Sequence, residues 1–326
     1  MRGQLLSPPI AASRLRQLRL KLRRTMPAEG MGIHLRRKQG QSLEFREHRS
    51  YQMGDDIRSV DWLASARRYG SGPDDLLVRA FEAEEKMLVA VVLDLRPAMA
   101  LPEAAPKLLF ALWAAQSLVR NAAEAGDEVV LGTLFGPEDL RPQRLRGARA
   151  VAAAAALAAR AWQARGGHPE TLPPVRPERL IRALKPAAAV VLISDMLFED
   201  PEGKVEALAL AAQRSRRELL VMELDSFAAE AAAPALNGPV VLAPFEGRSF
   251  APTPGRFGQP EFDAARQAMR TFLAERRRLW RRGGLFWPEA VEWPAGSGTE
   301  DLATLFRLRF AAHPVLRALV GQGSSG

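Results

Sequence analysis

Apolar and polar residues form distinct blocks between residues 87 and 224. Short runs rich in Val, Leu and Ala lack apolar–polar alternation, which is typical of strands buried on both faces. These predicted strands cover residues 87–94, 127–135, 188–194 and 218–224. Longer segments between them are predicted as helices, at residues 107–125, 151–164, 177–184 and 205–217. The pattern predicts an open α/β fold, with a mostly parallel, Rossmann-like sheet and helices on both faces.

The residues before this block follow other patterns. Residues 11–24 place Leu15, Leu18 and Leu22 on one helical face among arginines, which predicts a short basic amphipathic helix. Short strands of a β-rich subdomain are predicted at residues 43–51, 57–62 and 76–81.

The residues after the block predict a hairpin and two helices. The hairpin strands are expected at 240–243 and 246–250, with a turn at Gly247. A long basic helix, a short strand and a last helix are predicted at 260–282, 284–287 and 301–310. The resulting organisation is an N-terminal helix and linker (1–32), the β-rich subdomain (33–86), an α/β domain (87–312) with a hairpin insertion at about 238–252, and a tail (313–326).

The stretch LEFREHRSYQMGDDIRSVDW, residues 43–62, mixes many charged side chains with three aromatics and has no helix-period apolar stripe. Its Gly-Asp-Asp sequence suits a tight turn. The acids nearly balance the arginines, which favours an ion-pair network over a binding patch of one charge. Such clusters occur both as structural braces and as catalytic sites, so both interpretations stay open.

This stretch resembles the signature of the bacterial domain-of-unknown-function 58 family. The matching residues are Glu44, Phe45, Arg46, Tyr51, Gly54, Asp55, Asp56, Arg58, Asp61, Trp62, Ala66 and Arg67. The similarity continues through residues 76–85 into the strand at 87–94, although Met53 stands where family members often have Pro. The resemblance implies a von Willebrand factor A-like domain after the signature. It also implies a MoxR-type AAA+ ATPase as partner, because family members are often encoded beside one.

Composition restricts the classes of protein. The 326 residues include no cysteine, which excludes disulfides and thiolate metal sites and suits a cytoplasmic protein. No apolar run reaches the roughly 18–20 residues that a membrane span requires. Residues 5–12 are apolar but short and contain two prolines, unlike a signal peptide. A soluble, cytoplasmic protein is therefore expected.

The formal net charge of +9 raises the question of nucleic-acid binding. Basic residues are spread along the chain, with two clusters at Arg14–Arg24 and Arg277–Arg282. A nucleic-acid groove normally interleaves aromatic with basic side chains. The first cluster has no aromatic residue and the second has only Trp280, so nucleic acid is an unlikely partner. Acidic protein surfaces, or peripheral contact with anionic lipid heads through Arg14–Arg24, remain open.

Candidate chemistry lies where two buried strands end, at Asp94 and Asp195. The resemblance implies a metal-ion-dependent adhesion site there, whose first loop reads Asp-x-Ser-x-Ser. In this chain Arg96 and Ala98 replace the two serines, and the loop expected to supply a threonine, residues 145–149, has no hydroxyl. Mg²⁺ or Mn²⁺ is disfavoured, because a guanidinium beside a divalent ion within ~4 Å costs several kcal/mol.

Two interpretations of the altered loop follow. Arg96 either bridges Asp94 and Asp195 in place of a metal, as a planar guanidinium can, or points to solvent from a decayed loop. The site is accordingly interpreted as a degenerate adhesion site with no cofactor.

Other catalytic motifs are missing from the sequence. It contains no phosphate-binding Gly-x-x-x-x-Gly-Lys-Ser/Thr loop and no Gly-x-Ser-x-Gly elbow. His48 is expected to be a hydrogen-bonding residue, and Trp62 an anchor over the ion pairs of the signature. The favoured function is a non-enzymatic protein-interaction module, partner or adaptor of a MoxR-type ATPase. The alternative is an uncharacterised enzyme that uses Asp55, Asp56 and Asp61.

Overall fold

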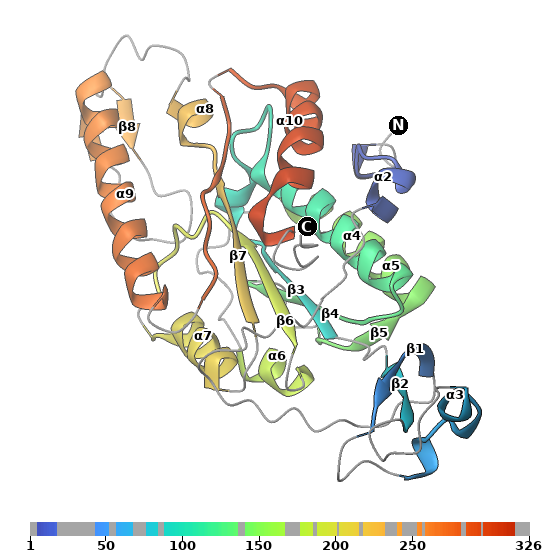
Figure 1. Ribbon diagram of the computed structural model, residues 1–326. Coiled ribbons are helices and arrows are strands. Elements are labelled where there is room, and N and C mark those ends of the chain that lie inside the picture. Colours follow the sequence, from blue (N-terminus) through green and yellow to red (C-terminus); the bar gives the residue numbers. More distant parts are fainter. Residues whose placement is uncertain are drawn as a thin grey trace. The chain divides into compact units, whose positions relative to one another are not determined.

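The computed structural model describes most of the chain (Figure 1). The described residues are 5–17, 43–51, 57–67, 76–83, 88–135, 141–166, 177–184, 188–200, 202–214, 218–231, 240–242, 253–255, 258–281, 285–294 and 296–316. The chain divides into two compact units. The larger comprises Met1–Met26 with Met87–Gly326, and the smaller comprises Pro27–Lys86.

A six-stranded sheet forms the centre of the larger unit, with strand order β10-β7-β6-β3-β4-β5. Its strands are β3 (Leu88–Asp94), β4 (Glu128–Leu134), β5 (Arg144–Arg146), β6 (Ala189–Ser194), β7 (Glu218–Asp225) and β10 (Val291–Glu292). All neighbouring strands are parallel except β5, which runs antiparallel to β4. The predicted open, mostly parallel α/β fold is confirmed.

Helices cover both faces of this sheet (Figure 1). One face packs against α4 (Lys107–Glu124), α5 (Gly147–Ala164) and α10 (Thr299–Ala312), and the other against α6 (Pro177–Ala183), α7 (Lys204–Arg214) and α9 (Gln259–Arg281). Every residue of β3 is buried, and alternate residues contribute to opposite cores. Each fully buried Val or Leu side chain contributes about 1.5–3 kcal/mol, which explains why residues 88–93 of β3 are all apolar.

The chain turns sharply between α4 and β4. Gly126 has φ +80°, a left-handed conformation in which a side chain would be strained. The Asp127 N–H donates to the Ala122 carbonyl at 3.0 Å, so the end of α4 is closed by the pattern that often ends helices. This turn reverses the chain and allows β4 to run parallel to β3.

The described part of the N-terminal segment packs on the larger unit. Leu15, in α2 (Ala12–Gln17), is buried in the same core as α4. Trp113 Nε1 donates to the Leu5 carbonyl at 2.9 Å, and Gln116 Nε2 donates to the Leu6 carbonyl at 2.8 Å. The remainder of the predicted basic helix, residues 18–24, lies outside the described residues.

The smaller unit contains β1 (Leu43–Ser50) and β2 (Leu77–Ala83), which pair antiparallel. The strand predicted at residues 57–62 is wrong. A 3₁₀ helix, η1 (Ile57–Ser59), and then α3 (Trp62–Ala66) occupy this stretch. The reason is local: Asp61 caps α3 by accepting a hydrogen bond from the Ala64 N–H at 3.0 Å, and a cap overrides a weak strand pattern.

The C-terminal part differs from the prediction in detail. β8 (Val240–Leu242) pairs antiparallel with β9 (Thr253–Gly255), whereas the predicted second hairpin strand and its turn at Gly247 lie outside the described residues. The strand predicted at 284–287 is reduced to an isolated bridge at Phe286, and β10 follows it. Residues 227–231 form α8 (Phe227–Ala231), and the Asp225 carboxylate accepts from the Phe227 N–H at 2.9 Å.

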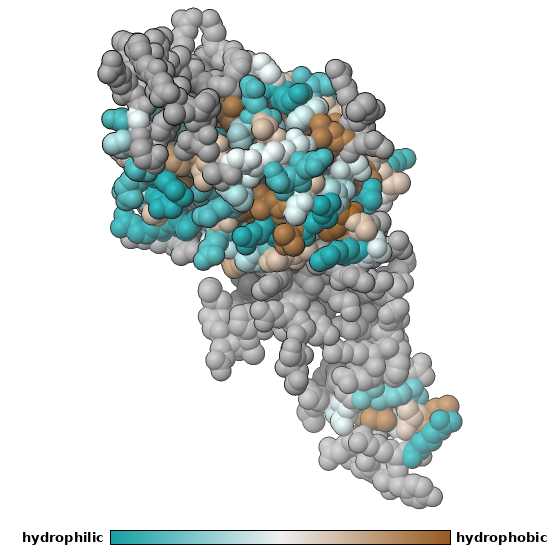
Figure 2. All heavy atoms as spheres, turned by 90° about the horizontal axis from the view of Figure 1, so that it is seen from above, coloured by the Kyte–Doolittle hydropathy of each residue, from teal (hydrophilic) through white to brown (hydrophobic). Residues whose placement is uncertain are grey.

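Hydrophobic residues on the face shown in Figure 2 occur in small groups among hydrophilic ones. Among the described residues, no helix combines the length and the apolar character needed to cross a membrane.

Candidate functional site

Two aspartates lie at the same edge of the central sheet. Asp94 is the last residue of β3, and Asp195 directly follows β6. β3 and β6 are neighbouring parallel strands, with Leu93 opposite Ile193, so their carboxyl ends lie side by side. This edge is where open α/β sheets bind ligands. Both aspartates are buried, so their charges need partners within the protein.

Arg96 supplies a partner to both carboxylates. Its Nη2 donates to Asp94 Oδ2 at 2.8 Å and also contacts Asp195 Oδ1. Its Nε donates to Asp94 Oδ2 at 3.1 Å, and its Nη1 to the Leu197 carbonyl at 3.2 Å. The guanidinium is buried rather than directed to solvent, and it contacts Asp195, which lies 99 positions further along the sequence.

Local backbone contacts fix the loop after β3. The Arg96 N–H donates to Asp94 Oδ1 at 3.0 Å, and Arg96 precedes the 3₁₀ helix η3 (Pro97–Ala100). Ala98 lies in η3 and presents only a methyl group. Ser194 approaches from β6 instead: its Oγ donates to Asp94 Oδ2 at 2.7 Å and accepts from the Met196 N–H at 2.8 Å. A hydroxyl therefore does reach Asp94, from a strand that the sequence analysis did not consider for it.

Lys107 completes the cluster, and the sequence analysis did not find it. It is the first residue of α4 and is only 4% exposed. Its Nζ donates to Asp195 Oδ2 at 3.0 Å and to Glu230 Oε1 at 3.1 Å. The available signal was a lone cation at the start of the apolar helix 107–125, where a charge must be paired if it is buried.

The pKa values of the cluster follow from this pairing. Burial alone would lower the pKa of Lys107, but the attraction of Asp195 and Glu230 outweighs burial and raises it. Burial would raise the pKa of Asp195, but Lys107 and then Arg96 hold it well below its usual range. Both groups are therefore charged at neutral pH, and neither is a ready proton donor or acceptor.

Phe198 lies between two guanidinium groups at this edge. The guanidinium carbon of Arg96 is 5.3 Å from the centre of the Phe198 ring, and that of Arg276 is 4.4 Å from it. Arg276, from α9, also donates to the Met196 and Phe198 carbonyls, each at 2.6 Å. These contacts attach α9 to the segment that carries Asp195.

The backbone is strained at two points beside the cluster. Phe135, after β4, has φ +53°, and Met196, after β6, has φ +60°. Left-handed conformations cost non-glycine residues about 1–3 kcal/mol and persist where surrounding contacts enforce them. Here the contacts are those of Ser194 and Arg276 with Met196 and of the Arg96 guanidinium over the Phe135 ring. The strain marks this edge as a constrained part of the fold.

The residues at this edge do not fit a divalent cation. Mg²⁺ requires about six oxygen ligands in near-octahedral geometry. The four carboxylate oxygens of Asp94 and Asp195 already accept N–H groups from Arg96, Lys107 and the backbone. Among the residues that the structure describes, no group of three or more His, Asp or Glu side chains could hold a metal ion.

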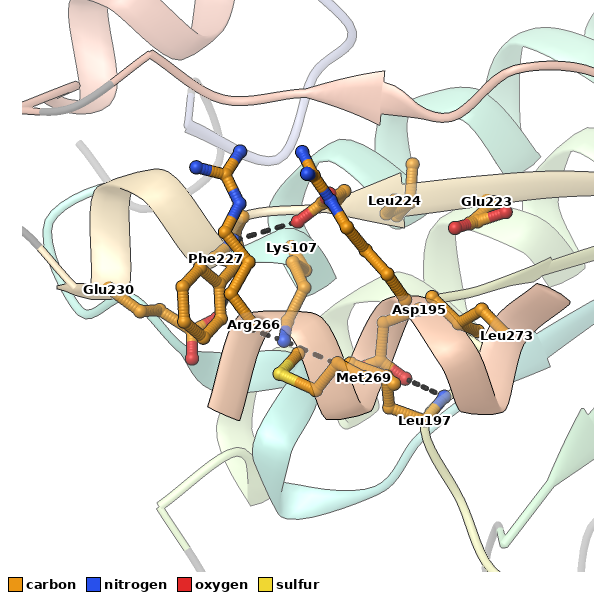
Figure 3. A pocket seen from close by; sticks show the side chains of 13 residues that line it. Lys107, Asp195, Leu197, Glu223, Leu224, Phe227, Glu230, Arg266, Met269 and Leu273 are labelled. Atoms are coloured by element: carbon orange, nitrogen blue, oxygen red, sulfur yellow. Dashed lines mark hydrogen bonds and ion pairs between the residues drawn. The ribbon is translucent and has the colours of Figure 1, made fainter. Parts of the chain in front are cut away.

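A small pocket of about 40 Å³ adjoins the cluster (Figure 3). The ends of β6 and β7 line it together with α8 and α9. The lining residues are Lys107, Asp195, Leu197, Glu223, Leu224, Asp225, Ser226, Phe227, Glu230, Arg266, Met269, Arg270 and Leu273. In Figure 3 the ammonium of Lys107 lies between Glu230 and Asp195, with Phe227 and Met269 nearby.

A second buried carboxylate, Glu223 on β7, lines the same pocket. Trp287 Nε1 and Arg277 Nη2 both donate to its Oε2, each at 2.5 Å. Burial raises the pKa of Glu223, while the bonds from Trp287 and Arg277 act in the opposite direction. Trp287 is buried, as is Trp293.

The signature residues lie in the smaller unit, and the structure describes only some of them. Glu44 and Arg46 are on β1, whose partner is β2. Gly54, Asp55 and Asp56 lie outside the described residues. Tyr51 follows β1, and its N–H donates to the Leu76 carbonyl at 2.7 Å.

The remaining signature residues surround α3. Asp61 accepts hydrogen bonds from the Ala64 N–H and, at 2.9 Å, from His48 Nε2, so His48 is a hydrogen-bonding residue as expected. Arg58 is exposed on η1, and Arg67 is exposed at the end of α3. Trp62 is 59% exposed, so more than half of its surface is not covered by other residues, and its role as an anchor over ion pairs stays a prediction. Its position at the start of a short surface helix explains the exposure.

The loop that was expected to supply a threonine lies elsewhere. Residues 144–146 form β5, and Arg146 pairs with Glu128, the first residue of β4. Asp94 instead pairs with Leu134, the last residue of β4. Residue 146 therefore lies at the amino end of β4, whereas Asp94 lies at its carboxyl end, because the antiparallel strand β5 reverses the direction of the chain.

Comparison with known proteins gives one family match. Residues 47–243, more than half of the chain, match the family described as "Protein of unknown function DUF58". No curated protein matches the chain. The chain is similar to the crystal structure of an aerotolerance-related membrane protein from Bacteroides fragilis NCTC 9343 with multiple mutations to serines. That similarity has 13% identity and a TM-score of 0.34, and it covers 69% of this chain and 99% of the other. Asp94, Arg96, Lys107 and Asp195 all lie within the family match.

Proposed function

The chain belongs to the DUF58 family, and from this membership and the buried charge cluster we propose that it acts as a protein-interaction module rather than as an enzyme. One observation carries the proposal. The acids at the ligand-binding edge of the sheet, Asp94 and Asp195, are bonded by cations of the same chain. A general acid or base needs a proton that can reach a substrate, whereas these groups are buried and held in charged form.

In this proposal the edge is a degenerate metal-ion-dependent adhesion site of a von Willebrand A-like domain. The guanidinium of Arg96 lies between two carboxylates that would otherwise hold a cation. A rigid, internally neutral edge keeps the surrounding loops in one conformation without depending on metal supply. It therefore suits a surface that is recognised by another protein.

The proposed partner is a MoxR-type AAA+ ATPase, in the cytoplasm. The partner follows from the family resemblance, since family members are often encoded beside such an ATPase. The sequence itself has no phosphate-binding loop for ATP and no cysteine. The chain would thus serve the ATPase as partner or adaptor.

The alternative, an enzyme that uses Asp55, Asp56 and Asp61, has less support. Of these three acids only Asp61 is described, and its two carboxylate oxygens accept from the Ala64 N–H and from His48. A carboxylate engaged in capping a helix is occupied structurally. The described residues therefore favour the interaction module.

Affinity co-purification from the native host, with and without ATP, tests the proposal. Glu199 is exposed near Asp195, and Glu124 is exposed at the far end of α4 from Lys107. We expect mass spectrometry to identify a MoxR-type ATPase with the wild type and with Glu124→Arg. Glu199→Arg should change the amount recovered, because the charge is reversed at the proposed edge.

The two outcomes that contradict the proposal differ. If no AAA+ ATPase accompanies the wild type in either nucleotide state, the partnership is wrong. Equal loss of the ATPase with Glu124→Arg and Glu199→Arg would instead mean that binding does not occur at the carboxyl edge.

A further inference from the structure

The pocket beside Lys107 is too small for a metabolite or a cofactor. Sites for such ligands measure about 300–1,000 Å³, whereas this pocket has about 40 Å³. That volume holds a few water molecules, at roughly 10–15 Å³ for each. A single side-chain group of another protein fits this size.

Lys107 makes two interactions of different strength. Asp195 is buried and also bonded by Arg96 and by the Leu197 N–H, so it is permanently held. Glu230 is 32% exposed and lies on α8, a helix of five residues, and its Oε1 also accepts from the Ser226 hydroxyl. Losing Glu230 would leave Lys107 paired with Asp195, so Glu230 can be exchanged without leaving a buried charge alone.

The pocket has two further cations at its rim, both from α9. Arg266 is half-buried with its guanidinium carbon 5.8 Å from the centre of the Phe227 ring, and Arg270 is exposed. Neither makes an ion pair with another residue in the described part of the chain. In Figure 3 the side chain of Arg266 extends away from the Lys107 ammonium. Its stem therefore lines the pocket while its charge is available to a ligand outside.

From these contacts we infer that the pocket binds a carboxylate side chain of an acidic protein segment, which replaces Glu230 on Lys107. Neighbouring acids of the same segment bind Arg266 and Arg270. The inference rests on the proposed interaction function and specifies the chemistry of the partner. The carboxylates of Asp195, Glu223 and Asp225, which also line the pocket, already accept hydrogen bonds from within the chain. Lys and Arg are donors only, so a ligand that binds them must present acceptor oxygens, and charge-assisted bonds are about twice as strong as neutral ones.

A labelled hexaglutamate peptide tests the inference by fluorescence anisotropy with the full-length protein, with hexaglutamine as the neutral control. Arg270→Glu reverses one charge at the rim, and Arg278→Glu makes the same change elsewhere on α9, at an exposed residue that does not line the pocket. We expect Arg270→Glu to weaken binding at least about fivefold and Arg278→Glu less than about twofold, since rim charges act locally at physiological salt.

The internal competitor gives a second, opposite effect. Glu230→Gln replaces the carboxylate on Lys107 by a neutral amide, so hexaglutamate should bind about fivefold more tightly. Glu275→Gln makes the same change at an exposed residue of α9 that does not line the pocket and should change the affinity less than about twofold. Inorganic phosphate is added as a competitor and compared with chloride at the same ionic strength. Displacement of the peptide by phosphate alone would identify a general oxyanion site.

Several results would overturn the inference. One is that the wild type does not bind hexaglutamate, and another is that phosphate displaces it. The others are that Arg270→Glu and Arg278→Glu weaken binding equally, or that Glu230→Gln and Glu275→Gln have equal effects on it. Co-purification separates the two proposals. If the ATPase is recovered equally with the wild type and with Arg270→Glu, only the pocket inference is wrong. If Arg270→Glu weakens peptide binding but no ATPase is recovered, only the proposed partner is wrong.

Discussion

The two compact units of this chain differ in the most conspicuous side chains that each buries or exposes. In the α/β unit Asp94, Arg96, Lys107 and Asp195 are buried and bonded to one another. In the smaller unit three large apolar residues are exposed, Ile57 by 60%, Trp62 by 59% and Leu63 by 66%. The larger unit thus buries a cluster of paired charges, while these three apolar side chains of the smaller unit face solvent, as Leu308 of the larger unit also does.

The family signature in the smaller unit is easily recognised in the sequence, whereas the charge cluster in the larger unit is the more constrained part of the structure. The family signature is compact in sequence, yet its described residues mostly lie at a surface. The charge cluster has no compact motif, yet its members enforce strained backbone and displaced pKa values. A conspicuous motif and a constrained site need not coincide in one protein.

The largest effect is expected at the centre of the cluster. Arg96→Ala leaves Asp94 without its guanidinium and Asp195 with Lys107 alone, so unfolding should become easier by about 3–5 kcal/mol. The matched change Arg67→Ala in the smaller unit removes an exposed guanidinium and should cost less than about 0.5 kcal/mol. Urea unfolding followed by tryptophan fluorescence measures both. A loss below about 1 kcal/mol for Arg96→Ala would contradict the role given to this pairing.

His313 and the charge cluster should affect the free energy of unfolding of the larger unit in different pH ranges. Burial lowers the pKa of His313 to about 4, from 6.5 when unfolded. Between pH 6.5 and 4 the unfolded chain binds the additional proton, so stability that is present above pH 6.5 falls as the pH falls, by roughly 3 kcal/mol in all. The depressed pKa of Asp195 gives a loss of stability in the same direction but at lower pH: the contribution of the cluster persists to about pH 4 and is lost only below that.

Urea unfolding at pH 7.5, 5.5 and 4.5 tests this assignment. In His313→Gln the free energy of unfolding should fall less steeply as the pH is lowered, because glutamine does not titrate. An unchanged decline would show that another group is responsible.

A smaller effect is expected at the helix cap of the smaller unit. Asp61→Ala removes the acceptor for the Ala64 N–H and should cost about 1 kcal/mol. Asp61→Asn retains a capping oxygen and serves as the control. Hydrogen exchange of the Ala64 amide reports the change within this unit, and equal exchange in Asp61→Ala and the wild type would mean that the cap adds no stability.

The smallest effect is expected at the exposed apolar surface. Trp62→Ala should change the free energy of unfolding by less than about 0.5 kcal/mol although it removes a large aromatic side chain. The same substitution at the buried Trp293 is the internal standard and should be strongly destabilising. Similar losses at the two positions would show that Trp62 is covered in solution.

The sequence predicts the central strands well because each is buried on both faces and is therefore mostly apolar. It does not predict β5, whose Arg-Leu-Arg sequence has no apolar signal, or α3, where the Asp61 cap decides between helix and strand. At the candidate site, the nearness of Asp94 and Asp195 follows from two strands that end at one edge. The positions of Lys107 and Glu230 do not, since they depend on how α4 and α8 pack, which no local pattern encodes.

The short outer strands of the sheet affect how the protein behaves when it is concentrated. β5 has three residues and β10 has two, and β5 carries the exposed Arg144 and Arg146 on either side of Leu145. A long, flat, apolar edge would offer unpaired backbone groups to a strand of another molecule and seed aggregation. Short edges, one of them flanked by guanidinium groups, give little length for such pairing. A sheet with apolar central strands is thereby protected from growing into fibrils, and the protein should stay dispersed at high concentration.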